Sequence, residues 1–309
     1  MKKIDTCIII LNWNGKEMLK DCLSSLFKLT NYPNYKVIVV DNGSTDGSVE
    51  FVKKNFKKAD ILALDKNYGF AIGNNMGMKY ALKKYKPKYI LLLNNDTEII
   101  QKDWLTQMIK ASESDKNVGI VGCNLLFPDK SLQFAGLRKL SLIIPPFPHF
   151  ITKEKSSHSY YSLFIPATCF LIKRELISTI GFFDEIFAPF SAEDGDFCMR
   201  AIKNGFRIYH CGEASIVHKI GLSTKKLEEK TKWFVFTKNH FLFLLKHFPQ
   251  FFLIGFLGRL ATSFLTIKDR RKGLSIKNLV LNPKGIILLF ITIKAAISSF
   301  SIFLRSFKS

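Results

Sequence analysis

The sequence predicts an α/β fold with a mostly parallel central sheet, and two features of its first hundred residues predict it. Short apolar runs rich in β-branched residues alternate there with longer segments whose apolar residues recur at helical spacing. Such alternation is typical of a parallel, doubly wound sheet flanked by helices. The chain has 309 residues, 47% of them hydrophobic, which is ample for one large domain and an appendage.

Each expected element follows from its own pattern. The buried strands are the apolar runs at residues 6–11, 36–40, 61–64 and 89–93. The helices between them are expected at residues 16–27, 44–56 and 71–85. From about residue 127 to 161 the periodicity fades, and prolines followed by a polar run predict a long mobile loop of the kind that often belongs to a substrate site. Order returns at residues 164–174, and a further helix is expected at 195–204.

Polar residues directly after the strands are the first site candidates, because open α/β sheets bind ligands beyond the carboxyl ends of their strands. They are Asn12, Asp41, residues 65–67 and residues 94–96. Asp41 lies at a strand-to-helix turn, where its carboxylate could accept a hydrogen bond from N3–H of uracil or thymine. The alternative is that the residues of this turn only shape it and cap the helix.

Residues 67–77 open a helix with glycines and amides, among them Asn67, Gly69 and Asn74. Such a segment can bring backbone N–H groups and a helix N-terminus against phosphate. Close packing of the helix on the sheet is the alternative. Neither G-x-G-x-x-G nor G-x-x-x-x-G-K-[ST] occurs near it, which disfavours a dinucleotide or P-loop site.

Two acidic segments are the candidates for metal binding and for proton transfer. Asp96 ends the triplet Asn94-Asn95-Asp96 after an apolar strand, where an acid can ligate a divalent cation that also holds a pyrophosphate, or simply cap a helix. Residues 193–196 place three carboxylates before a helix, after an aromatic-rich stretch. Favourable charge at a helix N-terminus does not call for three acids, and a partly desolvated carboxylate with a raised pKa can act as a general base.

The charge and the last third of the chain indicate a membrane surface. Lys and Arg number 46 against 25 Asp and Glu, a net charge of +21, which implies anionic partners such as nucleic acid, phosphorylated small molecules or acidic lipid. Apolar segments at residues 233–248, 251–267 and 285–304 alternate with basic residues, which favours anionic lipid over nucleic acid. Lys294 lies mid-segment and is costly at a bilayer centre, so in-plane amphipathic helices are expected. A dimer-interface hairpin and a spanning helix stay open.

Cysteine usage and the N-terminus indicate the compartment. The six cysteines are scattered without a C-x-x-C pair, so they are expected to be small buried hydrophobes in a reducing compartment. The apolar run after Lys3 is too short for a signal peptide and is expected to be the first strand. The catalytic part is therefore expected at the cytoplasmic face of the cell membrane.

Five motifs in fixed order resemble glycosyltransferase family 2, and most closely its rhamnosyltransferase-like bacterial members. They are Ile-Leu-Asn-Trp-Asn-Gly (10–15), Val-Asp-Asn-Gly-Ser-Thr-Asp-Gly-Ser (40–48), Asn-Tyr-Gly-Phe-Ala-Ile-Gly-Asn-Asn (67–75), Leu-Leu-Asn-Asn-Asp (92–96) and Glu-Asp-Gly-Asp-Phe-Cys-Met-Arg (193–200). Residues 181–185, His218 and the Gly221-x-Ser223 pair fit the same pattern. The match covers roughly residues 5–250.

The resemblance implies a GT-A fold and an inverting transfer from a UDP- or dTDP-sugar, with Mg²⁺ or Mn²⁺ as cofactor. By similarity, Asp41 reads the pyrimidine and Asp194 deprotonates the acceptor hydroxyl. Asp96 is then the metal-binding end of a D-x-D-like element, and His218 a second metal or diphosphate contact. The donor-binding set implied by the motifs is Asn12, Asp41, Asn67, Gly69, Asn74, Asn95 and Asp96. The basic residues that could assist the diphosphate are Lys66, Arg200 and Lys219.

The chain departs from the family pattern at three places. Asn94 occupies the first D-x-D position, Ala167-Thr168 replaces a frequent Gly-Ala pair, and Lys238-Asn239 stands where relatives often show Arg-Asn. The processive Gln-x-x-Arg-Trp signature is absent, which favours addition of a single sugar.

These observations predict a catalytic domain at residues 1–225, with a nucleotide-sugar half at about 1–125 and an acceptor half at about 126–225. A helical membrane-associating region is expected at 226–309. Its presence motivates a lipid-linked or cell-surface glycan acceptor, and the nearest resemblance suggests dTDP-rhamnose as donor. The chain is expected to pellet with membranes and to be released by removal of residues after about 250. The oligomeric state stays open, with a dimer as one option.

Two other functions compete with this hypothesis. A nucleotidyltransferase would be expected to carry an early Gly-rich, basic loop, which residues 12–15 lack. A membrane-attached binding module needs no base, whereas this chain keeps both Asp96 and the Asp194 cluster.

Overall fold

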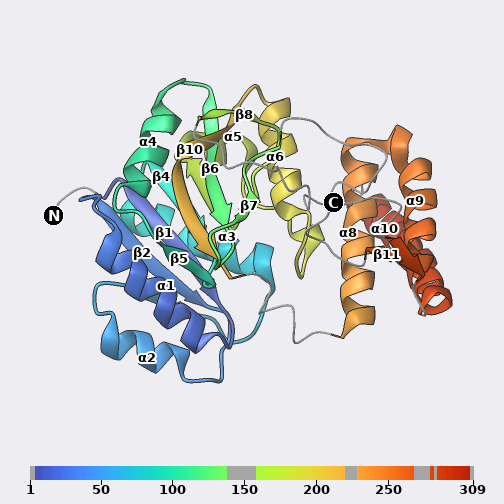
Figure 1. Ribbon diagram of the computed structural model, residues 1–309, viewed down its shortest axis with the longest axis horizontal. Helices are drawn as coiled ribbons and strands as arrows, with labels where there is room; N and C mark the ends of the chain where they lie inside the picture. Colours follow the sequence, from blue (N-terminus) through green and yellow to red (C-terminus); the bar gives the residue numbers. More distant parts are fainter. Residues whose placement is uncertain (1–3, 138–157, 220–227, 268–278, 282–283, 307–309) are drawn as a thin grey trace.

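The computed structural model describes residues 4–137, 158–219, 228–267, 279–281 and 284–306. A central sheet is covered by helices, and three further helices stand together at one end of the molecule (Figure 1). Three predicted features lie outside the described residues: most of the mobile loop, the Gly221-x-Ser223 pair, and the boundary between residues 225 and 226. The division into two domains therefore stays a prediction.

The first half of the sheet consists of four neighbouring parallel strands in the order β3-β2-β1-β4. Their bounds are β1 Thr6–Asn12, β2 Tyr35–Asp41, β3 Asp60–Ala63 and β4 Tyr89–Leu93. The connecting helices are α1 Lys16–Leu29, α2 Ser48–Asn55 and α3 Phe70–Tyr85. α3 packs on the sheet face that carries Ile9 and Val40, and α1 and α2 cover the other face (Figure 1). The predicted doubly wound arrangement is confirmed here.

The second half of the sheet is mixed, which the sequence did not predict in detail. β9 is antiparallel to both β4 and β6, β10 runs parallel to β6, and β5 is antiparallel to β10. The strands are β5 Thr97–Ile99, β6 Val118–Leu126, β7 Leu132–Phe134, β8 Tyr160–Ser162, β9 Cys169–Lys173 and β10 Arg207–His218. The helices are α4 Trp104–Glu113, α5 Arg174–Ile180, η1 Glu185–Phe187 and α6 Glu193–Lys203. The pairing of β5 with β10 places His218 opposite Thr97.

The prediction that the second helix begins at residue 44 was wrong, because local hydrogen bonds hold the residues before it in a turn. The Ser44 N–H donates to Asp41 Oδ2 at 2.8 Å, and the Thr45 N–H donates to Asn14 Oδ1 at 2.7 Å. Short polar side chains that bond nearby backbone groups compete with helix formation. α2 therefore begins at Ser48, whose N–H donates to Asp46.

All six cysteines are free and buried, which confirms the interpretation of them as small hydrophobes. They lie in one continuous core with the buried strand residues, such as Ile8, Ile9 and Ile10 of β1. Full burial of an aliphatic side chain stabilises the fold by about 1.5–3 kcal/mol. The rigid strands that carry this core fix the positions of the polar residues at their ends.

The three apolar segments near the C-terminus form helices that pack on one another (Figure 1). They are α8 Glu229–His247, α9 Phe252–Phe264 and α10 Gly285–Ser306, joined by η2 Pro249–Phe251 and by the antiparallel pair β11 Leu265–Ile267 and β12 Leu279–Leu281. One stripe of α10 faces α8: Thr292 accepts a hydrogen bond from the Trp233 indole at 2.9 Å, and the Ser299 hydroxyl donates to the Lys238 carbonyl at 2.8 Å. Within the described residues, α10 is the one helix long and apolar enough to cross a membrane.

A small hydrophobic cluster joins these helices to the part of the chain that carries the large sheet. Its members come from the segment before α6 and from α8, with α10 residues at its edge: Phe187, Ala192, Leu242, Phe243, Ile302 and Phe303. The helices at the C-terminal end therefore contact the segment that leads into the acidic motif.

Candidate active site

Three of the predicted donor residues meet at the carboxyl edge of the parallel strands. The Asn95 amide donates to Asn12 Oδ1 at 2.8 Å, and the Asn12 amide donates to Asp41 Oδ1 at 3.3 Å. All three side chains are buried. Asp41 Oδ2 also accepts the Ser44 N–H, so this carboxylate shapes its own turn. The position of the group is the one at which open α/β sheets bind ligands.

Three further predicted donor residues, Asn67, Gly69 and Asn74, lie at or within the first turns of α3. Asn67 Oδ1 accepts hydrogen bonds from the Asn42 amide and from the Gly69 N–H, at 2.9 and 2.8 Å. Gly69 has a φ of +84°, and a Cβ there would lie 2.5 Å from the Pro189 carbonyl oxygen. Asn74 donates to a carbonyl within α3. These contacts correspond to the packing alternative, and a role in phosphate binding stays a prediction.

Asp96 and His218 are 122 positions apart in sequence, and the structure brings them together. Asp96 Oδ1 lies 3.3 Å from His218 Nε2. The pair is too poorly aligned for a hydrogen bond, and Asp96 Oδ1 is buried with no hydrogen-bond partner. His218 Nδ1 lies 2.6 Å from Gln133 Oε1, which acts as the acceptor and so assigns the proton to Nδ1. A neutral His218 then presents an Nε2 lone pair beside the free carboxylate oxygen.

This arrangement fits a divalent cation. Carboxylate oxygen and imidazole nitrogen are both ligands for Mn²⁺, and a second-shell acceptor that fixes the histidine tautomer is usual in metal sites. The described residues contain no group of three or more His, Cys, Asp and Glu side chains able to hold a metal ion. Two protein ligands would leave the remaining positions to diphosphate and water.

Gln133 was missed by the sequence reasoning. It lies on the three-residue strand β7, and its amide also donates to the His218 carbonyl at 3.2 Å. Both contacts join residues 85 positions apart, so no local pattern marks it.

Asp194 is held by two backbone N–H groups. Its Oδ2 accepts from Ala167 at 3.2 Å, and its Oδ1 accepts from Gly195 at 2.8 Å. The neighbouring Thr168 carbonyl accepts the Asn94 N–H at 2.9 Å, so one short segment connects Asp194 with the strand end that leads to Asp96. Burial raises the pKa of Asp194 above its ordinary value despite the two N–H donors.

Glu193, next to it, is buried, whereas Asp194 itself is half-buried. One of its carboxyl oxygens has no hydrogen-bond partner. Burial and then the charge of Asp194 raise the pKa of Glu193 to about 8. Both effects therefore favour the protonated form of Glu193.

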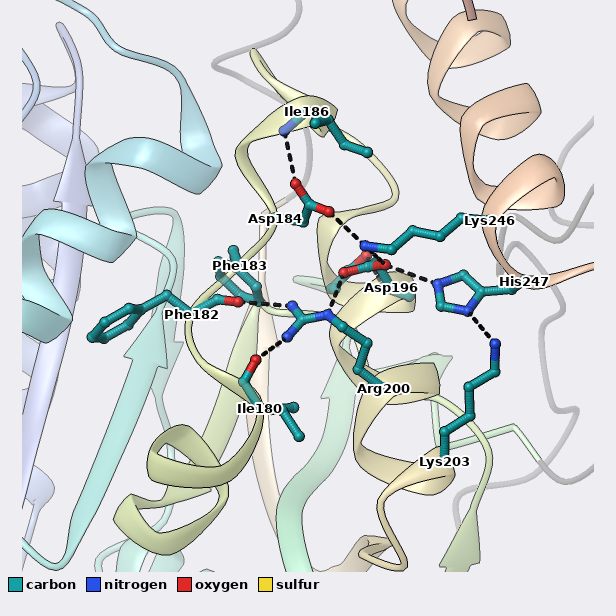
Figure 2. Close-up of polar contacts among 12 residues, drawn as sticks. Ile180, Phe182, Phe183, Asp184, Ile186, Asp196, Arg200, Lys203, Lys246 and His247 are labelled. Carbon is teal, nitrogen blue, oxygen red and sulfur yellow. Dashed lines mark hydrogen bonds and ion pairs between the residues drawn. The ribbon is translucent and has the colours of Figure 1, made fainter. Parts of the chain in front are cut away.

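Asp196, the third acid of the motif, has a different environment (Figure 2). Arg200 Nε donates to its Oδ2 at 2.8 Å, while Lys246 Nζ and His247 Nε2 lie 2.7 and 2.8 Å from its Oδ1. Burial works to raise the pKa of Asp196, but the hydrogen bond from His247 and the charges of Arg200 and Lys246 lower it to about 2. Asp196 is thus a fixed anion that joins α6 to α8.

Arg200 was predicted to assist the diphosphate, and this prediction was wrong. Its two terminal nitrogens donate to the carbonyls of Ile180 and Phe182, at 2.6 and 2.7 Å, and its Nε is bound to Asp196 (Figure 2). Lys219 bonds Asp21 at 2.9 Å. The guanidinium of Arg200 thus ties α6 to the end of α5 and the segment after it, whereas the Lys219 contact is an exposed ion pair.

Glu193→Gln is expected to remove a pH dependence of stability. Between pH 4.5 and about 8 the unfolded chain has released the Glu193 proton while the folded chain retains it, so stability falls as pH rises. The effect is on the order of a few kcal/mol. Melting temperatures at pH 5 and pH 8 should differ less in Glu193→Gln than in the wild type. A variant at exposed Glu17 is the control. If Glu193→Gln shows the same difference in melting temperature between pH 5 and pH 8 as this control, the raised pKa of Glu193 is contradicted.

Comparison with known proteins agrees with this geometry. The family model described as glycosyl transferase family 2 matches residues 7–181, more than half of the chain. The chain is 26% identical over 221 residues to the O-antigen biosynthesis protein RfbC of Myxococcus xanthus, covering 68% of this chain and 17% of that protein. It is 28% identical over 222 residues to the rhamnosyltransferase WbbL of Escherichia coli, covering 68% of this chain and 82% of that protein. The chain thus spans well under a third of RfbC and most of WbbL.

Solved structures show the same fold. The mannosyltransferase PcManGT of Pyrobaculum calidifontis, in complex with GDP-mannose and Mn²⁺, superposes with a TM-score of 0.56 at 15% identity. The alignment covers 98% of this chain and 88% of that protein, and it confirms the predicted GT-A-like fold. These matches are explained without the two competing hypotheses, a nucleotidyltransferase and a membrane-attached binding module. The chain belongs to glycosyl transferase family 2 and is a glycosyltransferase.

Proposed function

We propose that this glycosyltransferase is metal-dependent and inverting, and that it moves one sugar from a UDP- or dTDP-sugar to a lipid-linked or cell-surface glycan. The observation that carries the proposal is the connection of two acidic centres through one short segment. Residues 167 and 168 bond Asp194 on one side and Asn94, two residues before Asp96, on the other. These hydrogen bonds support the proposal because they link the proposed base to the strand end that carries the proposed metal ligand.

Asp194 is the proposed base. An acceptor hydroxyl at Asp194 would give up its proton to the carboxylate as its oxygen attacks the sugar C1 from the side opposite the leaving group. The N–H groups of Ala167 and Gly195 hold the carboxylate in place. Its raised pKa makes it a better proton acceptor than an exposed aspartate.

Asp96 and His218 are the proposed ligands of Mg²⁺ or Mn²⁺. A bound cation would neutralise the charge that develops on the leaving nucleoside diphosphate. Asn12, Asp41 and Asn95 form the floor of the proposed donor site, with Asp41 directed to the pyrimidine. The Mn²⁺ in the PcManGT complex supports the choice of cofactor, and the similarity to the rhamnosyltransferase WbbL supports rhamnose as the transferred sugar.

A calorimetric screen tests the donor assignment. UDP- and dTDP-sugars are titrated into the full-length chain in detergent with Mn²⁺, and one of them is expected to bind. Failure of every donor to bind would contradict the proposed site.

The outer faces of α9 and α10 are the proposed membrane contact, at the cytoplasmic face of the cell membrane. Nearly all large apolar side chains that the described residues expose lie on these two helices, with Ile286, Phe290 and Ile297 each 67% exposed. Exposed Lys294 and Arg305 lie on the same helix. A contiguous apolar face with basic residues is suited to the surface of an anionic bilayer.

Replacing Ile286, Phe290 and Ile297 together with serine is expected to lower binding to vesicles by more than tenfold. The three side chains stand away from the α8 contact, so the fold should persist, while each loses its burial in lipid. Co-sedimentation with vesicles containing phosphatidylglycerol measures the effect. Ile100→Ser, at an exposed apolar residue far from α10, is the matched control. Equal sedimentation of the triple variant and this control would exclude the proposed face.

A further inference from the structure

The loop that leads into the acidic motif has a strained backbone. Ser191 and Ala192 have φ values of +81° and +75°, in the left-handed region that side chains other than glycine disfavour. Glu193 and Asp194 follow directly. Strained residues of this kind persist only where surrounding contacts hold them, and they gather at active sites. The contacts that hold this loop are therefore candidates for a functional role.

Asn239 of α8 makes most of those contacts. Its side-chain amide donates to the carbonyls of Phe190 at 2.7 Å and Ser191 at 3.0 Å, and also to the carbonyl of Phe187. Asn239 is fully buried. Buried carbonyls need hydrogen-bond donors, and here the two N–H groups of one side chain serve three carbonyls of one loop. The adjacent Lys238 adds a contact of 3.2 Å to the Ala188 carbonyl.

α8 also holds the chain on the other side of Asp194. Asp196, two residues further on, is bound by Lys246 and His247 of α8 (Figure 2). His247 Nδ1 in turn lies 3.1 Å from Lys203 Nζ at the end of α6. Asp194 thus lies between two points at which its chain is tied to the same helix.

We propose that Asn239 is a positioning residue for the transfer reaction, acting through Asp194, and that the C-terminal helices complete the active site as well as contacting the membrane. The inference rests on the proposed role of Asp194 as base. Without the Asn239 amide, the carbonyls of Phe187, Phe190 and Ser191 lose this donor and the left-handed residues relax. The carboxylate of Asp194 then leaves the position set by Ala167, while the donor residues on β1 and β2 stay where they are.

The test compares Asn239→Ala with Ser299→Ala. Ser299 is equally buried and bonds the Lys238 carbonyl of α8, but it does not touch the loop. We expect Asn239→Ala to lower kcat for transfer by 10- to 100-fold with the donor KM unchanged, and Ser299→Ala to keep the wild-type kcat. A wild-type kcat in Asn239→Ala would overturn the proposal, as would an equal loss in both variants.

A double-mutant cycle separates positioning from general loss of structure. If Asn239 acts through Asp194, Asn239→Ala has no further effect on the residual rate of Asp194→Asn. A second loss of the same size in that background overturns the proposal. If Asn239→Ala fails to fold, Lys238→Met is measured in its place. A kcat lowered several-fold at constant donor KM supports the proposal, and an unchanged kcat overturns it.

The failure of this inference can be told from failure of the proposed function. Full activity of Asp194→Asn would reject Asp194 as base. An inactive Asp194→Asn together with a fully active Asn239→Ala would reject only the positioning role.

Discussion

Asp194→Asn is expected to lower the rate of sugar transfer by about 10²- to 10⁴-fold, the range that general-base catalysis contributes. Asparagine keeps the size of the side chain, and its single carbonyl oxygen can still accept one of the two hydrogen bonds that Ala167 and Gly195 donate to the two oxygens of Asp194. It cannot take a proton from the acceptor hydroxyl. Steady-state transfer with saturating donor measures the loss. Calorimetry should find donor affinity unchanged, because Asp194 lies on α6 whereas Asn12 and Asp41 of the proposed donor site end β1 and β2.

Glu193→Gln is the matched control for this prediction. Because Glu193 retains its proton up to about pH 8, the neutral amide imitates its state near neutral pH, and transfer at pH 7 should stay close to the wild-type rate. A fully active Asp194→Asn together with an inactive Glu193→Gln would assign the base to Glu193.

Asp96→Ala is expected to abolish metal-dependent donor binding. Asp96 is the only acid of its triplet, and its free Oδ1 lies beside His218 Nε2. His218→Ala should weaken Mn²⁺ binding in the same direction, and Gln133→Leu by about 10- to 100-fold, the usual effect of losing a second-shell partner. Mn²⁺ binding followed by electron paramagnetic resonance measures all three without an activity assay.

The control for the metal site is Asp21→Asn. Asp21 bonds Lys219, the residue after His218, but it is exposed and lies on α1. Its loss should leave Mn²⁺ affinity unchanged. Wild-type affinity in Asp96→Ala would show that the cation, if bound, is held elsewhere.

The first half of the fold could be predicted from the sequence because its signals are local. Each parallel strand is a short apolar run, and each is closed by polar turn residues such as Asn12 and Asp41. The second half could not, because β9 inserts antiparallel between β4 and β6, and strand order is set by long-range packing. The start of α2 was misplaced because the polar turn before it bonds Asn14, some thirty residues earlier.

The candidate site could likewise be predicted only in part, where its signals are local. Spacing within the acidic motif shows that Asp196 and Arg200 can pair along a helix, but not that Lys246 and His247 close around Asp196 from α8. The expectation that Asp96 and His218 act together came from the family resemblance, and not from their spacing in the sequence. Gln133 and Asn239 act through contacts with residues 85 and about 50 positions away, which leave no trace in a local pattern.

The most direct test of the account is release of nucleoside diphosphate from a UDP- or dTDP-sugar by the full-length protein in detergent with Mn²⁺ or Mg²⁺. The account predicts release from one donor, lost on addition of chelator and restored by excess metal. It also predicts no release by Asp96→Ala under any of these conditions. Release that persists at the same rate in chelator and in Asp96→Ala would contradict a metal-dependent site at Asp96 and His218.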